Sequence, residues 1–508
     1  YETSNMSPNI KIKWKKASGY YIYDDKNKRF IDFTSGIFAS SLGYKNKRLN
    51  NKIKKVLSNG FSHNYNFYND YREKYISKLI KFVSSRKLKK CFLTSAGTEA
   101  TETALKLARI YGSSINKKKI GVISIKGNWH GRTMGSQMMS GKNNDSSWVG
   151  YYDKYMHQID FPYPWVKRNE MRDFFKNSIN KVFRKNYDFK NNISMIILET
   201  FQGWGAVFYP VNYVKEIEKF CKKNNIILCF DEMQSGFART GKKFGFQHYK
   251  VNPDMICCGK GMGAGFSLSG VIGAKKLFDN NKIKGLSSTH SANPISCAAG
   301  LATIEEIEAS NLVENSRKQG ALLHKNLVNL RKKFNKIILN CLGNGLIGSI
   351  IFQNYNKYSG TQIANMVSTK CLEKGLLVCN TGRESIKLGP PLIIDGKGIT
   401  RAVKILRKSV EEIYNEINQI GVPESAVTIQ GNTSFVYIVN GEVAEKKDIK
   451  IGKRNFGKVS VLSGISAGDL VISEGEKISA VQYKALDRFG YLSGESRTIQ
   501  TAAIPIIF

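Results

Sequence analysis

Short apolar runs alternate with helical stretches over the first 420 residues of the chain. The runs lack a polar residue at every second position, which is typical of strands that are buried on both faces of a parallel sheet. Parallel strands need long crossover connections, and the helical stretches supply them. The runs cover residues 121–125, 195–198, 226–230 and 255–258, and the helical stretches include 99–110, 214–223 and 399–417. The alternation predicts an α/β fold with helices on both faces of a parallel sheet.

The pattern changes after Gly421-Val422-Pro423, where the helical period disappears. Short alternating runs follow at residues 435–439, 458–462 and 470–473, separated by turns such as Asn440-Gly441. Such runs are typical of a small all-β module. We therefore predict two domains, at residues 1–420 and 421–508.

The charge balance raises the question of a nucleic-acid partner, because 78 Lys and Arg against 40 Asp and Glu give a net charge of +38. The basic residues are spread along the chain with no long basic block, and neither zinc-ligand spacing nor an aromatic RNA-binding strand is found. A solvated basic surface is the favoured interpretation. With 42% hydrophobic and 23% charged residues, the composition excludes disordered and fibrous classes.

The cysteines indicate a reducing compartment. There are nine, all between Cys91 and Cys379, and several lie inside apolar runs, as small hydrophobic thiols do. No apolar run approaches the ~18–20 residues that a membrane span needs, and the first residues lack a signal-peptide pattern. We expect a cytoplasmic protein with no membrane span.

Two segments place backbone amides or a carboxylate where a ligand would bind. Ser95-Ala96-Gly97-Thr98 lies between an apolar run and a helical stretch, where free N–H groups and the helix dipole favour a phosphate. Asp231 directly follows the run at 226–230, at the end of a strand where parallel sheets bind ligands. An ordinary helix cap is the alternative interpretation for each segment.

Two further segments carry a lysine and an aromatic residue. Lys260 stands among glycines after the run at 255–258, and an amine in such a crevice would have its pKa lowered by desolvation, as Schiff-base chemistry needs. Trp129-His130-Gly131-Arg132 offers a ring that can cover a planar group and a guanidinium that can bind a carboxylate. A flexible glycine loop and an exposed surface turn are the respective alternatives.

Together the four segments supply the parts that pyridoxal phosphate needs: a phosphate site, an aromatic cover, an acid and an amine. Residues from about 14 to 417 resemble a class III, ornithine-type aminotransferase of the fold-type-I pyridoxal-phosphate enzymes, which have a mostly parallel sheet and a smaller second part. The remaining matching motifs lie at residues 19–24, 30–36, 236–241 and 289–294. The resemblance implies a large cofactor-binding part at about 61–299 and a small part built from both ends of the domain.

The resemblance also implies roles for single residues. Lys260 forms a Schiff base with the cofactor and then moves a proton between Cα and C4′, while Asp231 keeps the pyridine nitrogen protonated. The other implied contacts are Gly97 and Thr98 to the phosphate, Trp129 and Met233 to the ring faces, Gln234 near the ring hydroxyl, and Thr289 to the phosphate of a neighbouring subunit. The last contact implies a homodimer with shared active sites, and no metal is implied.

Two departures from the family pattern concern the substrate. The segment Glu199-Thr200-Phe201-Gln202-Gly203-Trp204 ends in Trp204, where ornithine- and aminobutyrate-type enzymes have a second acid. Lys387, with Arg383 nearby, occupies the position of the arginine that such enzymes direct at a carboxylate. A lysine offers a point charge where arginine offers a planar fork. Arg132 remains a candidate carboxylate contact, and both substrates stay open.

The expected function is transfer of an amino group from an amine or ω-amino acid to an oxo-acid. An aminomutase, decarboxylase or racemase of the same fold is the first alternative. The second is a binding or assembly protein whose function lies in the last domain. Residues 422–477 resemble the C-terminal β module of periplasmic adaptors of RND-type efflux pumps, and residues 478–508 resemble nothing that we can name.

Overall fold

The computed structural model describes residues 12–65, 67–140, 147–163, 170–283, 285–418, 420–441, 443–455, 457–466, 468–473 and 503–505. The chain divides into two compact units. The first comprises Tyr1–Gln353 and Gly360–Ser409, and the second comprises Asn354–Ser359 and Val410–Phe508. Helix α13 (Gly396–Ile417) begins in the first unit and ends in the second.

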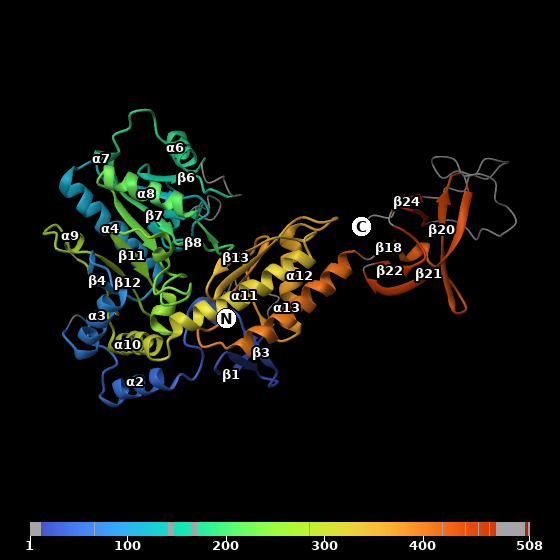
Figure 1. Cartoon of the computed structure of the whole chain (residues 1–508), viewed down its shortest axis with the longest axis horizontal. Coiled ribbons are helices and arrows are strands. Elements are labelled where there is room, and N and C mark those ends of the chain that lie inside the picture. Colours follow the sequence, from blue (N-terminus) through green and yellow to red (C-terminus); the bar gives the residue numbers. More distant parts are fainter. Residues whose placement is uncertain are drawn as a thin grey trace. The chain divides into compact units, whose positions relative to one another are not determined.

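The first unit is built on a seven-stranded sheet with the order β4-β12-β11-β10-β7-β5-β6 (Figure 1). The neighbouring strands β11, β10, β7, β5 and β6 pair in parallel, whereas β12 is antiparallel to both β11 and β4. Its strands are β4 (Leu88–Thr94), β5 (Gly121–Ile125), β6 (Met156–Ile159), β7 (Ile193–Glu199), β10 (Ile227–Asp231), β11 (Met255–Cys258) and β12 (Ser269–Ala274). The predicted α/β class with a mostly parallel sheet is confirmed.

Strand β12 departs from the parallel pattern because its connection is short. Only a ten-residue loop, residues 259–268, joins β11 to β12. A parallel return needs a crossover of a dozen or more residues, so the chain turns back antiparallel. The short loop also keeps Lys260 close to the end of β11.

Helix α4 (Gly97–Ile115) covers one face of this sheet. Its residues Ala100, Ala104 and Leu107 pack on alternate strand residues such as Ile197 and Cys257. The small alanines allow close approach, and this contact fixes where the first turn of α4 meets the strand ends. The other helices of the central part are α5 (Met134–Met139), α6 (Met171–Val182), α7 (Phe189–Asn192), α8 (Val211–Lys223) and α9 (Lys275–Phe278).

Segments from both ends of the first unit pair with each other. The sheet β1-β2-β3-β15 joins β3 (Arg29–Asp32) in parallel to β15 (Leu376–Leu377). A second sheet, β13-β14-β17-β16, places β17 (Ser385–Leu388) beside β14 (Ile347–Phe352). The other strands are β1 (Trp14–Ser18), β2 (Tyr21–Asp24), β8 (Phe201–Gln202), β9 (Val207–Phe208), β13 (Ile338–Asn344) and β16 (Cys379–Asn380).

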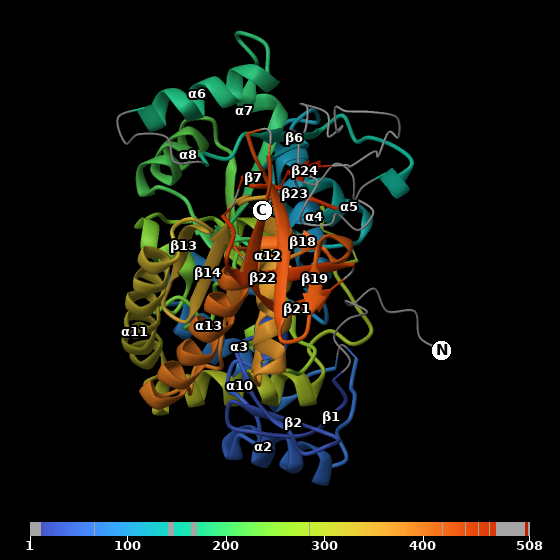
Figure 2. The ribbon, with the colours of Figure 1, turned by 90° about the vertical axis from the view of Figure 1, so that its right-hand side faces the viewer.

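Longer helices pack around these sheets. Helix α10 (Pro294–Ala309) packs against both α2 (Lys47–Ser58) and α3 (Asp70–Val83), and α11 (Leu312–Lys333) lies along β13 (Figures 1 and 2). Two other helices are α1 (Ser35–Phe38) and α12 (Gly360–Glu373). None of the helices in the described part of the chain is both long enough and apolar enough to cross a membrane.

The second unit is an antiparallel sheet with the order β18-β22-β21-β20-β23-β24, and β19 pairs with β20. Val422, Val436, Val459 and Val461 lie in its core. The strands are β18 (Ile420–Pro423), β19 (Thr428–Gln430), β20 (Thr433–Asn440), β21 (Val443–Asn455), β22 (Lys458–Ser463), β23 (Leu470–Ile472) and β24 (Ala503–Pro505). The predicted all-β character is confirmed. Of the residues at 478–508, only 503–505 are among those described.

Candidate active site

Two buried carboxylates stand side by side at the carboxyl ends of neighbouring strands. Asp231 ends β10 and Glu199 ends β7, and these two residues are in register across the parallel pair. Their exposed fractions are 3% and 4%. Burial, and secondly the charge of Asp231, raise the pKa of Glu199 to about 7.

The carboxylate of Asp231 is held by two hydrogen-bonding groups. His130 Nδ1 lies 2.9 Å from Asp231 Oδ2, and the Met233 backbone N–H donates to Oδ1 over 3.0 Å. His130 is buried, and its Nε2 has no partner among the described residues. Because one group engages each oxygen, the orientation of the Asp231 carboxylate is fixed.

Lys260 follows the end of β11 with an unusual backbone conformation. Its φ is 44°, in the left-handed region, and glycines lie on both sides. Burial lowers the pKa of the Lys260 amine, opposed by the charges of Asp231 and Glu199. The predicted direction of this pKa shift is confirmed, and the shift favours the neutral, nucleophilic amine.

The first turn of α4 lies next to this group. Ala96, the N-cap residue, makes no side-chain capping bond, so first-turn amides keep N–H groups without an intrahelical partner. A Cβ added at Gly97 would lie 3.0 Å from Met233 Sδ, and one at Gly259 would lie 2.5 Å from it. Met233 therefore lies between the helix start and Lys260, and both glycines permit the close approach.

Thr98 and Trp129 flank the same region. Thr98 Oγ1 lies 2.5 Å from Thr133 Oγ1 and 2.9 Å from Ser136 Oγ. The Trp129 backbone N–H donates to Glu199 Oε2 over 2.9 Å. The guanidinium of Arg132, an exposed residue, lies over the Trp129 ring, 4.8 Å from its centroid. The structure therefore ties the predicted Trp129 segment to the acids at the strand ends.

A chain of side-chain hydrogen bonds runs from Lys387 to Glu199 through Gln234. Lys387 Nζ donates to Gln234 Oε1 over 2.9 Å, and Gln234 Nε2 donates to Glu199 Oε1 over 3.2 Å. Lys387, on β17, is 9% exposed. Burial, with a smaller contribution from the charge of Lys260, lowers the pKa of Lys387 to about 8, although the charge of Glu199 opposes this shift.

Trp204 lies in the turn between β8 and β9. Its Nε1 donates to Gln202 Oε1 over 2.7 Å, and Ser385 Oγ donates to its backbone carbonyl over 2.7 Å. The guanidinium of Arg383 lies over the Trp204 ring, 4.0 Å from the centroid. Trp204 is thus joined to the β17 side of the unit.

Thr289 takes part in none of the contacts that join the other predicted residues. Its side chain is exposed and makes no hydrogen bond to the described part of the chain. Two further residues belong to the group, Glu199 and His130. No role is predicted from the sequence for either of them. Glu199 follows an apolar run just as Asp231 does, so the same strand-end rule would have found it.

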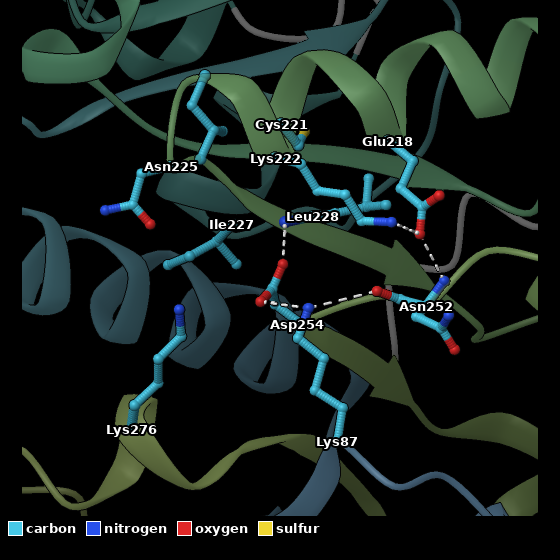
Figure 3. A pocket seen from close by; sticks show the side chains of 11 residues that line it. Lys87, Glu218, Cys221, Lys222, Asn225, Ile227, Leu228, Asn252, Asp254 and Lys276 are labelled. Atoms are coloured by element: carbon cyan, nitrogen blue, oxygen red, sulfur yellow. Dashed lines mark hydrogen bonds and ion pairs between the residues drawn. The ribbon is translucent and has the colours of Figure 1, made fainter.

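A separate cavity of about 240 Å³ lies at the opposite, amino end of β10 (Figure 3). Two of the three lysines at its wall are in ion pairs, since Lys87 lies 2.7 Å from Asp254 and Lys222 lies 3.1 Å from Glu218. None of the predicted site residues lines it. Over the described residues, no group of three or more His, Cys, Asp or Glu side chains is arranged to hold a metal ion.

Two family models match the chain. The model for "Aminotransferase class-III" matches residues 3–410, and that for "YknX, C-terminal permuted SH3-like domain" matches residues 419–479. The second match confirms the resemblance of the last module to the C-terminal β module of an adaptor.

Curated relatives cover most of the first unit. An acetylornithine aminotransferase of Caldanaerobacter subterraneus is 31% identical over 416 residues, 81% of this chain and 97% of the relative. One of Archaeoglobus fulgidus is 32% identical over 399 residues, 78% of this chain and 95% of the relative.

Solved structures share the fold. An aminotransferase of Bacillus anthracis superimposes with a TM-score of 0.74 at 25% identity, covering 81% of this chain and 96% of that one. A transaminase of the marine bacterium Virgibacillus has a TM-score of 0.73 at 24% identity, with coverages of 80% and 94%. The chain therefore belongs to the class III aminotransferases, which are pyridoxal-phosphate-dependent enzymes of fold type I.

Proposed function

We propose that the chain transfers an amino group from an amine or ω-amino acid to an oxo-acid at the strand-end site around Lys260. The observation that carries this proposal is the grouping of Lys260, Asp231 and Glu199 at the carboxyl ends of β7, β10 and β11. Relatives described as acetylornithine aminotransferases and neighbours described as omega transaminases support a terminal amine as the donor group.

The residues of this site fit pyridoxal phosphate by the chemistry of their donors. The free amides at Gly97 and Thr98 suit a phosphate, and the desolvated amine of Lys260 suits an aldehyde. Asp231 would pair with the ring nitrogen, Trp129 and Met233 would cover the ring faces, and Gln234 would lie near the ring hydroxyl. When bound, this cofactor supplies an electron-withdrawing ring that stabilises negative charge on the substrate carbon.

Lys260 would attach to the cofactor and, once displaced by substrate, accept and return the proton of the reacting carbon. A lowered amine pKa serves both steps, because the neutral form is the nucleophile and the base. His130 would act as a positioning residue, since it engages one oxygen of Asp231. Gln234 would be oriented by Lys387 and Glu199, which engage opposite ends of its amide.

We also propose a homodimer, with Thr289 contacting the phosphate in the partner's site. The exposed, unengaged side chain of Thr289 supports this role. Large apolar side chains exposed on two segments support an interface. They are Phe61, Tyr65, Phe67, Tyr68, Trp148, Tyr151 and Tyr152. Light scattering of the holoenzyme would give its molar mass directly.

The proposed location is the cytoplasm. All nine cysteines are free thiols, and Cys229 Sγ lies 3.8 Å from Cys257 Sγ in a hydrogen bond, without a disulfide between them. Persistent pairs of buried thiols that form no disulfide are characteristic of a reducing compartment.

Half-reaction spectra with a panel of donors test the proposed reaction. Trp204 and Lys387 replace the usual acid and arginine, so terminal amines and ω-amino acids should convert the bound cofactor at least about tenfold faster than glutamate does. Glutamate as the fastest donor by a wide margin would contradict the proposed donor class. Release of carbon dioxide or racemised amino acid without transfer would instead support a decarboxylase or racemase.

A further inference from the structure

Arg383, Ser385 and Lys387 are spaced two residues apart along and just before β17, and each of them contacts the opposite wall of the site. Lys387 Nζ binds Gln234, Ser385 Oγ binds the Trp204 carbonyl, and the Arg383 guanidinium lies over the Trp204 ring. Ser385 and Lys387 share a face of β17, because alternate strand residues do. Arg383 lies in the bend just before the strand and joins the same row through its contact with the Trp204 ring. The row presents two cations, one at each end.

The Lys387 side chain is buried and is already engaged by neighbouring groups. Its Nζ donates to Gln234, lies 4.9 Å from the centroid of the Phe38 ring and is 9% exposed as a residue. Gln234 is in turn bound to Glu199. The ammonium therefore holds an amide in place, and a lysine lacks the planar fork that would let it serve a carboxylate bidentately at the same time.

Arg383 is better placed for a ligand carboxylate. Its side chain is 38% exposed, and its ion pair is with the adjacent Glu384, at 3.1 Å. Exposed pairs of this kind hold each other weakly, so a ligand can compete with Glu384. An aromatic ring beneath the guanidinium restrains its plane and leaves N–H groups at the edge for bidentate contact. The Tyr163 ring also packs against Trp204 in an edge-to-face contact, with the two ring centroids 5.8 Å apart.

We propose that Arg383, supported by Trp204, is the residue on this side of the site that binds a substrate carboxylate, and that Lys387 is a positioning residue for Gln234. This inference rests on the proposed transaminase function and deepens it. It gives the β17 side of the site a preference for substrates that carry a carboxylate, and assigns that preference to a residue four positions before the one that the family pattern indicates.

The test compares two donors that differ only in a carboxylate, δ-aminovalerate and n-pentylamine, on the holoenzyme. Arg383→Gln should weaken half-saturation by δ-aminovalerate about tenfold or more, the loss expected for a charge-assisted hydrogen bond, and leave n-pentylamine unchanged. Arg383→Lys should fall between. Arg317→Gln is the matched control, because Arg317 also pairs with a nearby glutamate, Glu314, and is exposed.

A binding measurement gives a second readout that does not depend on turnover. Calorimetry with glutarate, which has no amine to transfer, should show about tenfold weaker binding to Arg383→Gln and no change for Arg317→Gln. Lys387→Met should instead lower the limiting half-reaction rate for both donors and alter the cofactor's absorbance spectrum.

The possible results distinguish a failure of the Arg383 assignment from a failure of the proposed transaminase function. If Arg383→Gln shows the same half-saturation by both donors and the same affinity for glutarate as the unmodified enzyme, the assignment to Arg383 is wrong. Selective loss of the carboxylate donor in Lys387→Met or in Arg132→Gln alone would give the role to that residue instead. If the unmodified protein binds no cofactor or converts neither donor, the proposed function fails before this question arises.

Discussion

The two units of the chain differ in whether charged side chains are buried in them. The first unit buries Asp231 and Glu199 beside two lysines of lowered pKa, Lys260 and Lys387. In the described part of the second unit the core is made of valine, isoleucine and alanine, and no carboxylate or amine is buried. Burying charge is costly unless it is paired, so a cluster of buried acids and lysines at strand ends points to a functional site. The comparison assigns the reaction to the first unit.

The largest expected effect is the loss of the Lys260 amine. Lys260→Ala should abolish covalent attachment of the cofactor and lower turnover by several orders of magnitude, because no other group replaces both nucleophile and base. Mass spectrometry after borohydride reduction checks the attachment. Lys250→Ala is the matched control, since Lys250 also has a left-handed backbone, with φ of 54°, but is exposed. Cofactor trapped on the Lys260→Ala protein would refute the assignment.

A smaller effect is expected from Asp231→Asn, which keeps the shape of the side chain and removes its charge. We expect the half-reaction rate to fall at least about hundredfold, because the ring nitrogen loses the charge that holds its proton.

Asp254→Asn serves as the control for burial alone. Asp254 is 9% exposed and accepts the Leu228 N–H, at the other end of the same strand. Its substitution should lower stability and leave the rate of the folded enzyme unchanged. Near-normal rates for Asp231→Asn would mean that another group protonates the ring.

The third prediction concerns pH and Lys387. Its pKa is lowered to about 8 from 10.5, so between these pH values the unfolded chain holds a proton that the folded chain has released. Stability contributed by this group therefore rises with pH across that window, and below it the buried ammonium is destabilising. Lys387→Met should raise the unfolding free energy of the cofactor-free protein by about 1–3 kcal/mol at pH 7.

The advantage of Lys387→Met should shrink as the pH approaches 10. Chemical denaturation of both proteins at several pH values measures the difference, and taking the difference cancels groups that the two share. An advantage that stayed constant with pH would show that Lys387 does not titrate in this window.

The smallest effect is expected from removing the β module that follows residue 420, which makes up most of the second unit. We propose that the enzyme domain ends near residue 420, and that a chain truncated there binds cofactor, dimerises and reacts as the full chain does. Cofactor occupancy, molar mass and half-reaction rate would be compared. Loss of the dimer or of cofactor would place part of the second unit inside the enzyme and break the comparison drawn above.

The local sequence pattern was sufficient to predict many of the strands in the fold. The apolar runs at 121–125 and 255–258 coincide with β5 and β11, because a fully buried strand leaves few alternatives. Strand β21 was missed, since Glu445, Lys446, Lys447 and Asp448 interrupt its alternation with charges that face solvent on an antiparallel sheet.

The location of a candidate site residue was predictable where it lies at or just after the end of a buried strand, as for Asp231 and Lys260. Contacts between loops that are distant in the sequence could not be predicted in this way. Arg383 reaches the ring of Trp204 only because the hairpin of β8 and β9 meets β17, and no local pattern encodes that meeting. His130 was overlooked for the same reason, since its partner Asp231 is 101 positions away.

The left-handed backbone of Lys260 has a consequence for attempts to engineer this enzyme. A non-glycine residue in that region costs roughly 1–2 kcal/mol, and the buried amine adds to the cost. Glycine at this position would remove both the backbone cost and the cost of the buried amine. A selection for heat resistance alone would therefore favour Lys260→Gly and yield a more stable protein with no catalytic activity. Any library built for robustness should hold position 260 constant and screen for bound cofactor before it screens for melting temperature.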